Sequence, residues 1–315
     1  MKISEDDLKL FNSSLNVERS KELLKILTSY TYYSQKYKAI YYEIPKCACS
    51  TLKFIIAYIE NNKIEFYNNN NIAQFYESTL KMGIHYREIN GLKSLANLNL
   101  KECEFILKSE DFFHFTFVRN PYSRIFSAWA DKIRQDEPGY QVILKNIRLT
   151  FGLEKKEIIS FDAFVKWISL KENVKTCNHH WRSMSSILIF DIFKSLKIYK
   201  LENFNNDIEN FLTQLKINVN KDFILSAFKF NESIPVLDWK DYYNEETAKI
   251  VYALYNEDFN NFNYSVDSWK KDKLDYSVSD LLDYIRNLER ASVSAIRDRN
   301  EMIYSIRNNF NLELK

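Results

Sequence analysis

The sequence predicts an α/β fold, in which a parallel β-sheet is flanked by helices and further helices are added at both ends of the chain. Two short apolar runs, at 38–44 and 112–118, each lead through a tight turn into an amphipathic helical pattern. Further strand-like runs follow, and repeated strand-turn-helix units of this kind favour a parallel sheet covered by helices. Such sheets bind ligands at the carboxyl ends of their strands, so the turns that follow these two runs are the expected site.

The composition narrows the class of protein. The 315 residues include only 4 glycines and 4 prolines but 21 tyrosines and 23 phenylalanines, which excludes collagen-like, linker-rich and low-complexity chains. A formal net charge of +2 argues against a broad surface for nucleic acid. The 4 cysteines are too few for a disulfide framework and indicate a reducing compartment. We expect a cytoplasmic protein, because no apolar run approaches the roughly 20 residues of a membrane span and the N-terminus is too acidic for a signal peptide.

We divide the chain into an N-terminal helical addition (1–37), an α/β domain (38–265) and a C-terminal helical extension (266–315). Residues 4–30 carry apolar side chains at helical spacing. The first strand ends at Pro45, and the helix that follows has an apolar face with i, i+3, i+4, i+7 spacing.

The second unit begins with the strand 112–118. Asn120 is a good N-cap and Pro121 a good first helical residue, because proline lacks an N–H that would be unpaired there. This helix should reach about residue 134. Further elements are expected as strands at 187–193 and 197–201, and as a helix at 244–258 with Asn244 as its N-cap.

The last part of the chain reads as a long helix. Beyond about residue 279, apolar residues recur in steps of four and three, with interruptions at Ser292 and Arg299. Because of these polar interruptions we favour a helix packed on its own domain. A homo-oligomer formed through this helix is the alternative.

The first turn, IPKCACSTLK at 44–53, has the chemistry of a phosphate cradle. Lys46 stands at the strand end, before a tight run of small residues and a helix start, where backbone N–H groups and the helix dipole favour an anion. It is not a Walker A loop, because its lysine precedes the loop and it lacks glycine. A solvated lysine and a simple helix cap would be the plainer interpretation. Cys47 and Cys49 lack the usual spacing of zinc ligands, so we expect no metal.

The second turn offers a second anion site. Arg119 ends a strand, and Arg124 and Ser127 follow on one face of the next helix. Arginine presents a planar fork that suits a phosphate monoester, and serine adds a hydroxyl. Singly, Arg119 could pair with a carboxylate and Ser127 could be a packing residue. Together the two turns define two anion sites on one sheet edge, as a nucleotide with phosphate at both ends would need.

These segments resemble a known family. PKCACSTLK, followed by FVRNPYSRIFSAWADKI, is similar to the 5′-phosphosulfate loop and the 3′-phosphate segment of sulfotransferases, nearest to the carbohydrate type of family 2, the chondroitin 4-O-sulfotransferases. Weaker similarity continues at His180-Trp181, at 200–204 and at 243–264. The resemblance implies a P-loop-NTPase-like sheet, the donor 3′-phosphoadenosine 5′-phosphosulfate (PAPS) and no metal. The acceptor would be a hydroxyl group of a carbohydrate or of another molecule.

Carried over residue by residue, the resemblance also implies roles. The 5′-phosphosulfate would be held by Lys46, Cys47, Ala48, Cys49, Ser50, Thr51, Leu52 and Lys53. The 3′-phosphate would be held by Arg119 and Ser127, with Arg124 beside them. The eukaryotic members carry an N-terminal membrane anchor, and none is visible in this sequence.

Sulfuryl transfer should depend on positioning, on Lys46 as the charge beside the leaving oxygen, and on a general base. Histidine has the most suitable pKa for that base, and the chain has 4. His114 lies in an apolar strand and reads as structural. We favour His85, between the two cofactor motifs, over His180, and Glu202 is a further candidate.

Two other functions stay open. A P-loop kinase would need the glycines and the loop lysine that are missing here. A non-catalytic nucleotide-binding or assembly protein of the same fold could use the C-terminal helix for partner contact.

Overall fold

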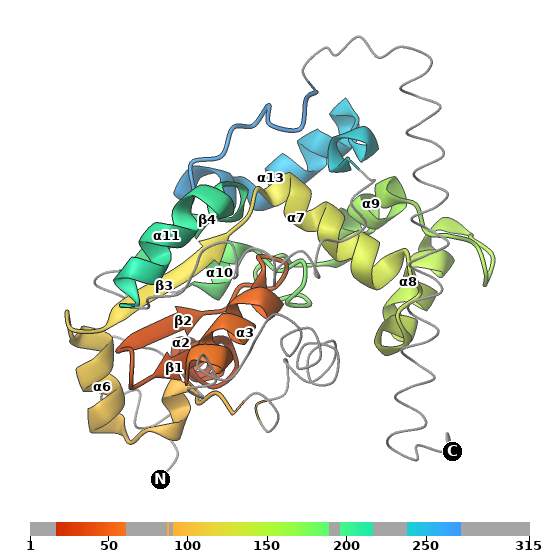
Figure 1. Ribbon diagram of the computed structural model, residues 1–315. Helices are drawn as coiled ribbons and strands as arrows, with labels where there is room; N and C mark the ends of the chain where they lie inside the picture. Colours follow the sequence, from red (N-terminus) through yellow and green to blue (C-terminus); the bar gives the residue numbers. More distant parts are fainter. Residues whose placement is uncertain (1–16, 61–86, 88–90, 189–195, 217–237, 272–315) are drawn as a thin grey trace, which may run out of the picture.

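The computed structural model describes residues 17–60, 87, 91–188, 196–216 and 238–271. Its sheet has the order β1 (Thr31–Ser34), β2 (Ala39–Tyr42), β3 (Phe113–Val118), β4 (Leu196–Lys200). Strands β2, β3 and β4 are parallel, and β1 pairs antiparallel with β2 at one edge (Figure 1). The predicted α/β class with a mostly parallel sheet is therefore confirmed.

Helices cover both faces of the sheet. On one face, α3 (Cys49–Glu60) and α11 (Phe204–Gln214) pack against Phe115 and Phe117 of β3. On the other face, α2 (Val17–Lys25), α6 (Leu100–Lys108) and α10 (Met184–Ile187) pack against side chains such as Ile40 and Val118. This two-sided burial explains why the strands read as nearly continuous apolar runs.

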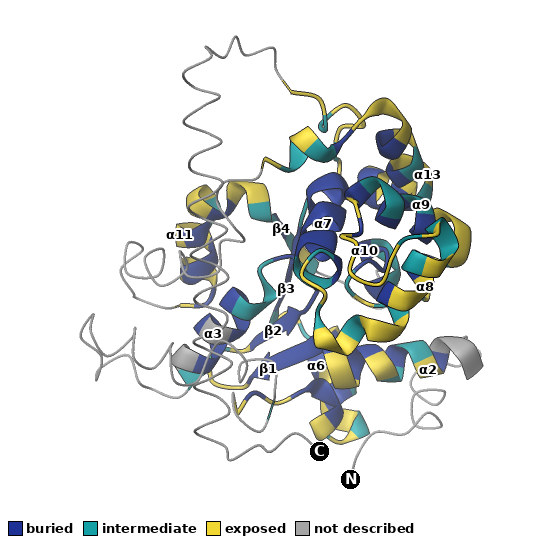
Figure 2. Ribbon diagram, turned by 90° about the vertical axis from the view of Figure 1, so that its right-hand side faces the viewer, coloured by how far each residue is buried: buried dark blue, intermediate teal, exposed yellow. Residues whose placement is uncertain are grey.

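A third layer of helices lies beyond the carboxyl ends of the strands. It contains α7 (Pro121–Ala128), α8 (Gln141–Phe151), α9 (Phe161–Lys171) and α13 (Glu245–Asn261). Every residue of α7 is buried, as Figure 2 shows along the whole helix. The remaining short elements are π-helical turns at Ile26–Tyr30 and Trp129–Ile133 and 3₁₀ turns at Leu95–Asn97, Pro138–Tyr140, Leu201–Asn203 and Trp239–Tyr242.

Both predicted helix starts are confirmed. The Asn120 side chain accepts a hydrogen bond from Tyr122 N at 3.0 Å, and Pro121 opens α7. At α13, the Asn244 side chain accepts from Thr247 N at 2.9 Å, and the Thr247 hydroxyl accepts from Asn244 N at 3.0 Å. These reciprocal bonds satisfy donors that a helix start would otherwise leave unpaired.

Two elements differ from the prediction. Ile187 closes α10 instead of opening a strand at 187–193, and residues 189–195 lie outside the described part. We expected residues 1–37 to be helical, but strand β1 lies among them. The helical turn ends at Tyr30, and the Thr-Tyr-Tyr-Ser segment that follows pairs with β2. The three-part division of the chain stays a prediction, since 1–16 and 272–315 lie outside the described residues, and so does the proposed heptad helix.

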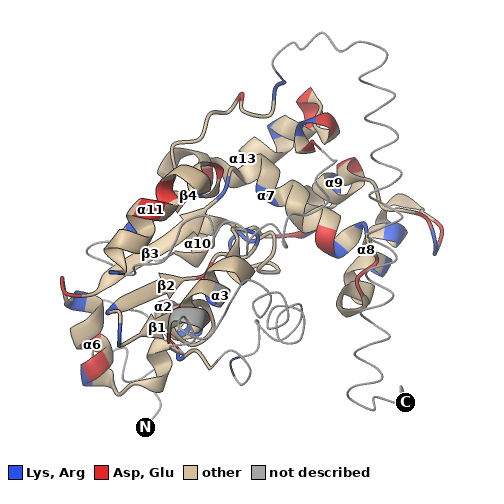
Figure 3. Ribbon diagram, in the orientation of Figure 1, with Lys and Arg blue, Asp and Glu red and all other residues tan. Residues whose placement is uncertain are grey.

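Charge is distributed in small groups over the described surface. Figure 3 shows acidic residues on α11, which has no Lys or Arg, and basic residues on α8, which has no Asp or Glu. Because charge is distributed in this way, any strong anion site must be local (Figure 3).

Among the described residues, no helix is both long enough and apolar enough to span a membrane.

His114 is held as a neutral ring inside the sheet. Its Nε2 is 3.1 Å from Ile106 O, a carbonyl that can only accept, so Nε2 carries the proton. Its Nδ1 then accepts from the Tyr42 hydroxyl at 2.9 Å. Burial lowers the pKa of His114 below its ordinary value of 6.5. This geometry supports the structural role expected for this histidine.

We expect stability to fall in mild acid because of His114. Below pH 6.5 the unfolded chain binds a proton at this ring that the folded chain does not, so the free energy of unfolding decreases as pH falls through that range. The slope reaches at most about 1.4 kcal/mol per pH unit for one ring. Urea unfolding between pH 8 and 5 measures it, and His114→Gln should reduce the slope. An equal slope in the variant would contradict the assignment.

Candidate active site

The turn after β2 has a strained backbone and leads directly into α3. Lys46 and Ala48 have φ angles of 70° and 59°, in the left-handed region that side chains with a Cβ rarely adopt. Cys47 fixes the turn to the protein interior, because its side chain is fully buried and its Sγ lies 3.8 Å from Met184 Sδ of α10. The first N–H groups of α3 lack intrahelical partners by geometry, so an anion in this turn would meet N–H donors and the positive end of a helix dipole.

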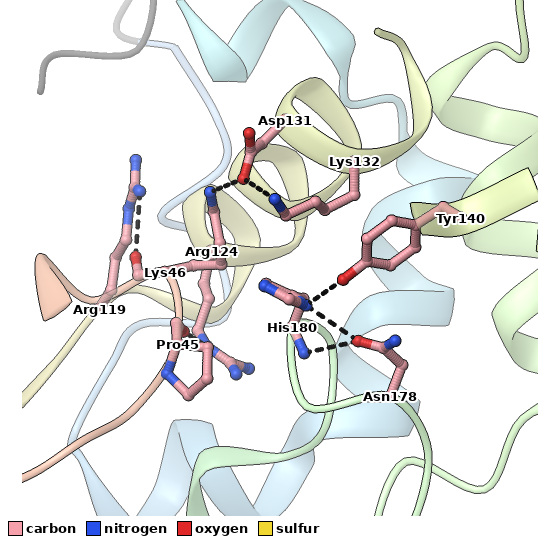
Figure 4. A network of polar contacts seen from close by, with 9 residues as sticks. All are labelled: Pro45, Lys46, Arg119, Arg124, Asp131, Lys132, Tyr140, Asn178 and His180. Atoms are coloured by element: carbon pink, nitrogen blue, oxygen red, sulfur yellow. Dashed lines mark hydrogen bonds and ion pairs between the residues drawn. The ribbon is translucent and has the colours of Figure 1, made fainter. Parts of the chain in front are cut away.

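Lys46 faces a carboxylate from the third layer. Its Nζ lies 2.8 Å from Asp131 Oδ2, and Lys132 Nζ lies 3.3 Å from the same oxygen (Figure 4). Burial alone would raise the pKa of Asp131, but the two ammonium groups outweigh burial and lower it. Two positive charges share one negative charge here, so the cluster carries a net positive charge beside the turn.

Arg119 reaches the same turn from the end of β3. Its Nε donates to Ser123 Oγ at 2.9 Å and its Nη1 to Lys46 O at 3.3 Å. Neither its Nη2 nor the hydroxyl of the largely buried Ser127 makes a hydrogen bond within the described part of the chain. These groups remain available as donors for a ligand.

Arg124 corrects our expectation of direct cofactor contact. Its side chain is 1% exposed, and its guanidinium donates to three carbonyls: Pro45 O at 3.0 Å, Arg182 O at 2.7 Å and His179 O at 3.3 Å. Every residue of α7 is buried, and the face that carries Arg124 meets the turn after β2 and the loop at 179–182. Arg124 therefore holds two loops together instead of facing a ligand.

The other predicted residues of α3 differ in how far they face the turn. Lys53 is 2% exposed, and its Nζ pairs with Glu43 Oε1 at 2.7 Å, a partner that raises the pKa of Lys53 against the opposing effect of burial. Contact between Lys53 and a donor stays a prediction, and Lys53 would have to leave Glu43 to make it. Leu52 is fully buried, so only its backbone can contribute, whereas Cys49 and Ser50 are partly exposed and Thr51 is 7% exposed.

The candidate bases are placed unequally. His85 lies outside the described residues. His180 is partly buried, and its Nδ1 lies 2.6 Å from the Tyr140 hydroxyl and 3.0 Å from Asn178 Oδ1. Burial first, and then the charges of His179 and the nearby cations, lower the pKa of His180 strongly. Glu202 accepts hydrogen bonds from Asn120 N and the Tyr264 hydroxyl, which ties it to the start of α7.

Four residues of this site are absent from our sequence prediction of it: Asp131, Lys132, Tyr140 and Asn178. Asp131 has a sequence signal, since it follows Ser127 by one helical turn. The other three have none. Within the described ranges, no cluster of three or more His, Cys, Asp or Glu side chains could hold a metal ion.

Comparison with known proteins decides the family. A model described as the sulfotransferase family matches residues 29–265. The chain belongs to the sulfotransferase family. The matched range includes β1, which lies before the domain boundary that we predict at residue 38.

The similar sulfotransferases are distant. The chain is 25% identical to human carbohydrate sulfotransferase 9 over 248 residues, covering 74% of the chain and 53% of that relative. It is 27% identical to mouse carbohydrate sulfotransferase 14 over 153 residues, covering 47% of the chain and 36% of that relative, and 26% identical to the human protein of the same name. The chain spans about half or less of the length of these relatives. No solved structure matches significantly.

The left-handed turn gives a stability prediction at Ala48. We expect Ala48→Val to destabilise the protein by about 1–2 kcal/mol, because a β-branched residue resists positive φ. Ala48→Gly should stay within about 1 kcal/mol of the parent, since glycine adopts this conformation freely but loses more entropy on folding. Urea unfolding compares the two variants. An Ala48→Val variant as stable as the parent would mean that residue 48 is not left-handed in solution.

Proposed function

We propose that this protein transfers a sulfuryl group from PAPS to a hydroxyl group of a carbohydrate. The observation that carries the proposal is the edge where β2 and β3 end: Lys46 and Arg119 extend from neighbouring strands and meet around one helix-start turn. Membership of the sulfotransferase family and similarity to proteins named carbohydrate sulfotransferases point the same way.

The donor groups of this edge suit a nucleotide with two anionic ends. The α3 start and Lys46 offer N–H groups and an ammonium to a phosphosulfate. Arg119 Nη2 and the Ser127 hydroxyl suit a phosphate monoester, for which a guanidinium is well shaped. The first set belongs to the turn after β2 and the start of α3, and the second to the end of β3 and to α7.

The chain's own residues would act mainly by position and charge. PAPS, when bound, supplies the sulfuryl group. Lys46 would exchange Asp131 for the bridging oxygen of the donor, where negative charge grows as the bond to sulfur breaks. Asp131, which also pairs with Lys132, would hold the Lys46 ammonium close to that position between turnovers. A base must also take the proton of the acceptor hydroxyl.

The acceptor and the location are proposals of the same kind. A carbohydrate acceptor rests on the names of the relatives, and variable loops build acceptor pockets, so another hydroxyl-bearing molecule is the alternative. The four cysteines are free, and the two in the turn are a buried Cys47 and a partly exposed Cys49. We keep the cytoplasm as the proposed compartment, because free thiols persist under reducing conditions.

Binding of adenosine 3′,5′-bisphosphate tests the donor site. We expect Lys46→Ala and Arg119→Ala each to weaken binding about 10- to 100-fold, because a charge-assisted hydrogen bond contributes about 1.5–3 kcal/mol. Lys108→Ala, which removes an exposed lysine paired with Glu104 on α6, is the matched control and should bind like the parent. Calorimetric titration measures all three. Tighter binding of ATP than of the bisphosphate would favour a kinase.

Transfer itself is measured with sulfur-labelled PAPS and a panel of carbohydrate acceptors. Label should move to an acceptor or, slowly, to water. A protein that binds the bisphosphate but leaves the donor intact with every acceptor would be a non-catalytic member of the fold.

A further inference from the structure

We infer that His180 is the base of the proposed transfer and that Asn178 is the residue that positions it, by fixing its ring with the proton on Nδ1 and the lone pair of Nε2 directed toward Lys46. This inference rests on the proposed function. It assigns a positioning role to Asn178, which has no signal in the sequence.

The amide of Asn178 has a defined orientation. Its Oδ1 lies 3.0 Å from the backbone N–H of His180, which can only donate. The oxygen of the amide, not its NH₂ group, must therefore face His180. This contact forms a local Asx turn, in which an asparagine side chain accepts from the backbone two residues later.

The same oxygen then sets the tautomer of the ring. Asn178 Oδ1 lies 3.0 Å from His180 Nδ1, and an amide oxygen beside a bare ring nitrogen would place two acceptors together. Nδ1 must therefore carry the proton. The Tyr140 hydroxyl, 2.6 Å from Nδ1, is compatible with this tautomer because a hydroxyl can accept as well as donate. In a neutral ring with Nδ1 protonated, Nε2 is the proton acceptor.

Nε2 is available for that task. It makes no hydrogen bond within the described part of the chain, and it is not among the polar atoms sealed there from solvent without a partner. Figure 4 shows this nitrogen on the side of the ring that faces Lys46 and Arg124, away from Tyr140 and Asn178. The loop is held there because Arg124 binds His179 O.

Burial, and after it the surrounding charges, keep the ring of His180 neutral before the donor binds. The groups that act on His180 are His179 in its own loop, Lys132 and Arg124 in the helical layer, and Lys46 in the turn. Burial is the largest cause that lowers the pKa of His180, and the positive charges of Lys132, Lys46 and Arg124 lower it further. The negative charge of a donor at Lys46 would offset the effect of these positive charges, which would raise the pKa of the ring when an acceptor is to be deprotonated.

The step balances as follows. The acceptor oxygen forms a bond to sulfur while the bond from sulfur to the 5′-phosphate oxygen breaks, and that oxygen keeps the electron pair beside Lys46. The hydroxyl proton passes to His180 Nε2. The products are the sulfate ester and adenosine 3′,5′-bisphosphate, and the proton leaves His180 to solvent afterwards.

The tautomer can be read without any activity. In protein labelled with ¹⁵N-histidine, the ring signals of His180 are identified by their loss in His180→Gln. We expect Nδ1 protonated and Nε2 bare in the parent, and a shift toward the other tautomer in Asn178→Ala. Asn178→Asp, which keeps an oxygen acceptor, should retain the parent tautomer. A parent ring protonated at Nε2, or a tautomer unchanged in Asn178→Ala, would overturn the positioning role.

Kinetics test the base. His180→Gln should lower kcat about 10²- to 10⁴-fold, the range typical of a lost general base, with little change in binding of adenosine 3′,5′-bisphosphate. Asn178→Ala should lower kcat up to about 100-fold, as a misplaced group does, and Asn178→Asp should restore most of it. Tyr140→Phe should have the smallest effect, because Asn178 alone specifies the tautomer.

The outcomes separate this inference from the function on which it rests. A parent protein that neither binds the bisphosphate nor transfers label refutes the proposed function, whatever the tautomer of His180. An active parent in which His180→Gln keeps full turnover while His85→Ala loses it refutes the inference and leaves the function standing.

Discussion

The site depends on one buried cation. Arg124, from the fully buried helix α7, donates to the carbonyl of Pro45 just before the turn and to the carbonyls of His179 and Arg182 in the loop that carries His180. A guanidinium out of water must find acceptors in the protein, because an unpaired buried charge is very costly. Here backbone carbonyls supply them. The requirement to satisfy Arg124 thus fixes the separation of the two loops, and through them the positions of Lys46 and His180.

The cluster of Lys46, Asp131 and Lys132 beside the turn also depends on the helical layer that contains α7. Asp131 and Lys132 belong to the π-helical turn that continues α7, and π-helical turns occur often at functional sites. They bring a carboxylate to Lys46 across a sequence separation of 85 residues. An almost neutral chain can therefore present a locally positive site, because two ammonium groups share a single carboxylate.

Much of the fold around the site was predictable because it is encoded locally. A pattern of a few residues indicates each of the two strand ends, the small-residue turn and the helix start at Asn120-Pro121. The partners of Arg124 were not predictable, because helical spacing shows which side chains share a face but not whether that face meets solvent or other loops of the chain. Strand β1 was missed because four residues are too few for a clear strand pattern, and its pairing with β2 is what makes it a strand. The contacts of His180 with Tyr140 and Asn178 arise from the meeting of two loops, for which a single sequence holds no pattern.

The turn that carries Lys46 holds left-handed residues without a glycine. A loop rich in glycine would sample many shapes before binding and would have to lose that freedom on each encounter with a ligand. Lys46, Cys47 and Ala48 have far fewer alternatives, and the burial of Cys47 removes more. The ordering of this loop is therefore largely completed during folding. Ligand affinity then has little loop entropy to overcome, and the strain at residues 46 and 48 is carried by the stability of the whole protein.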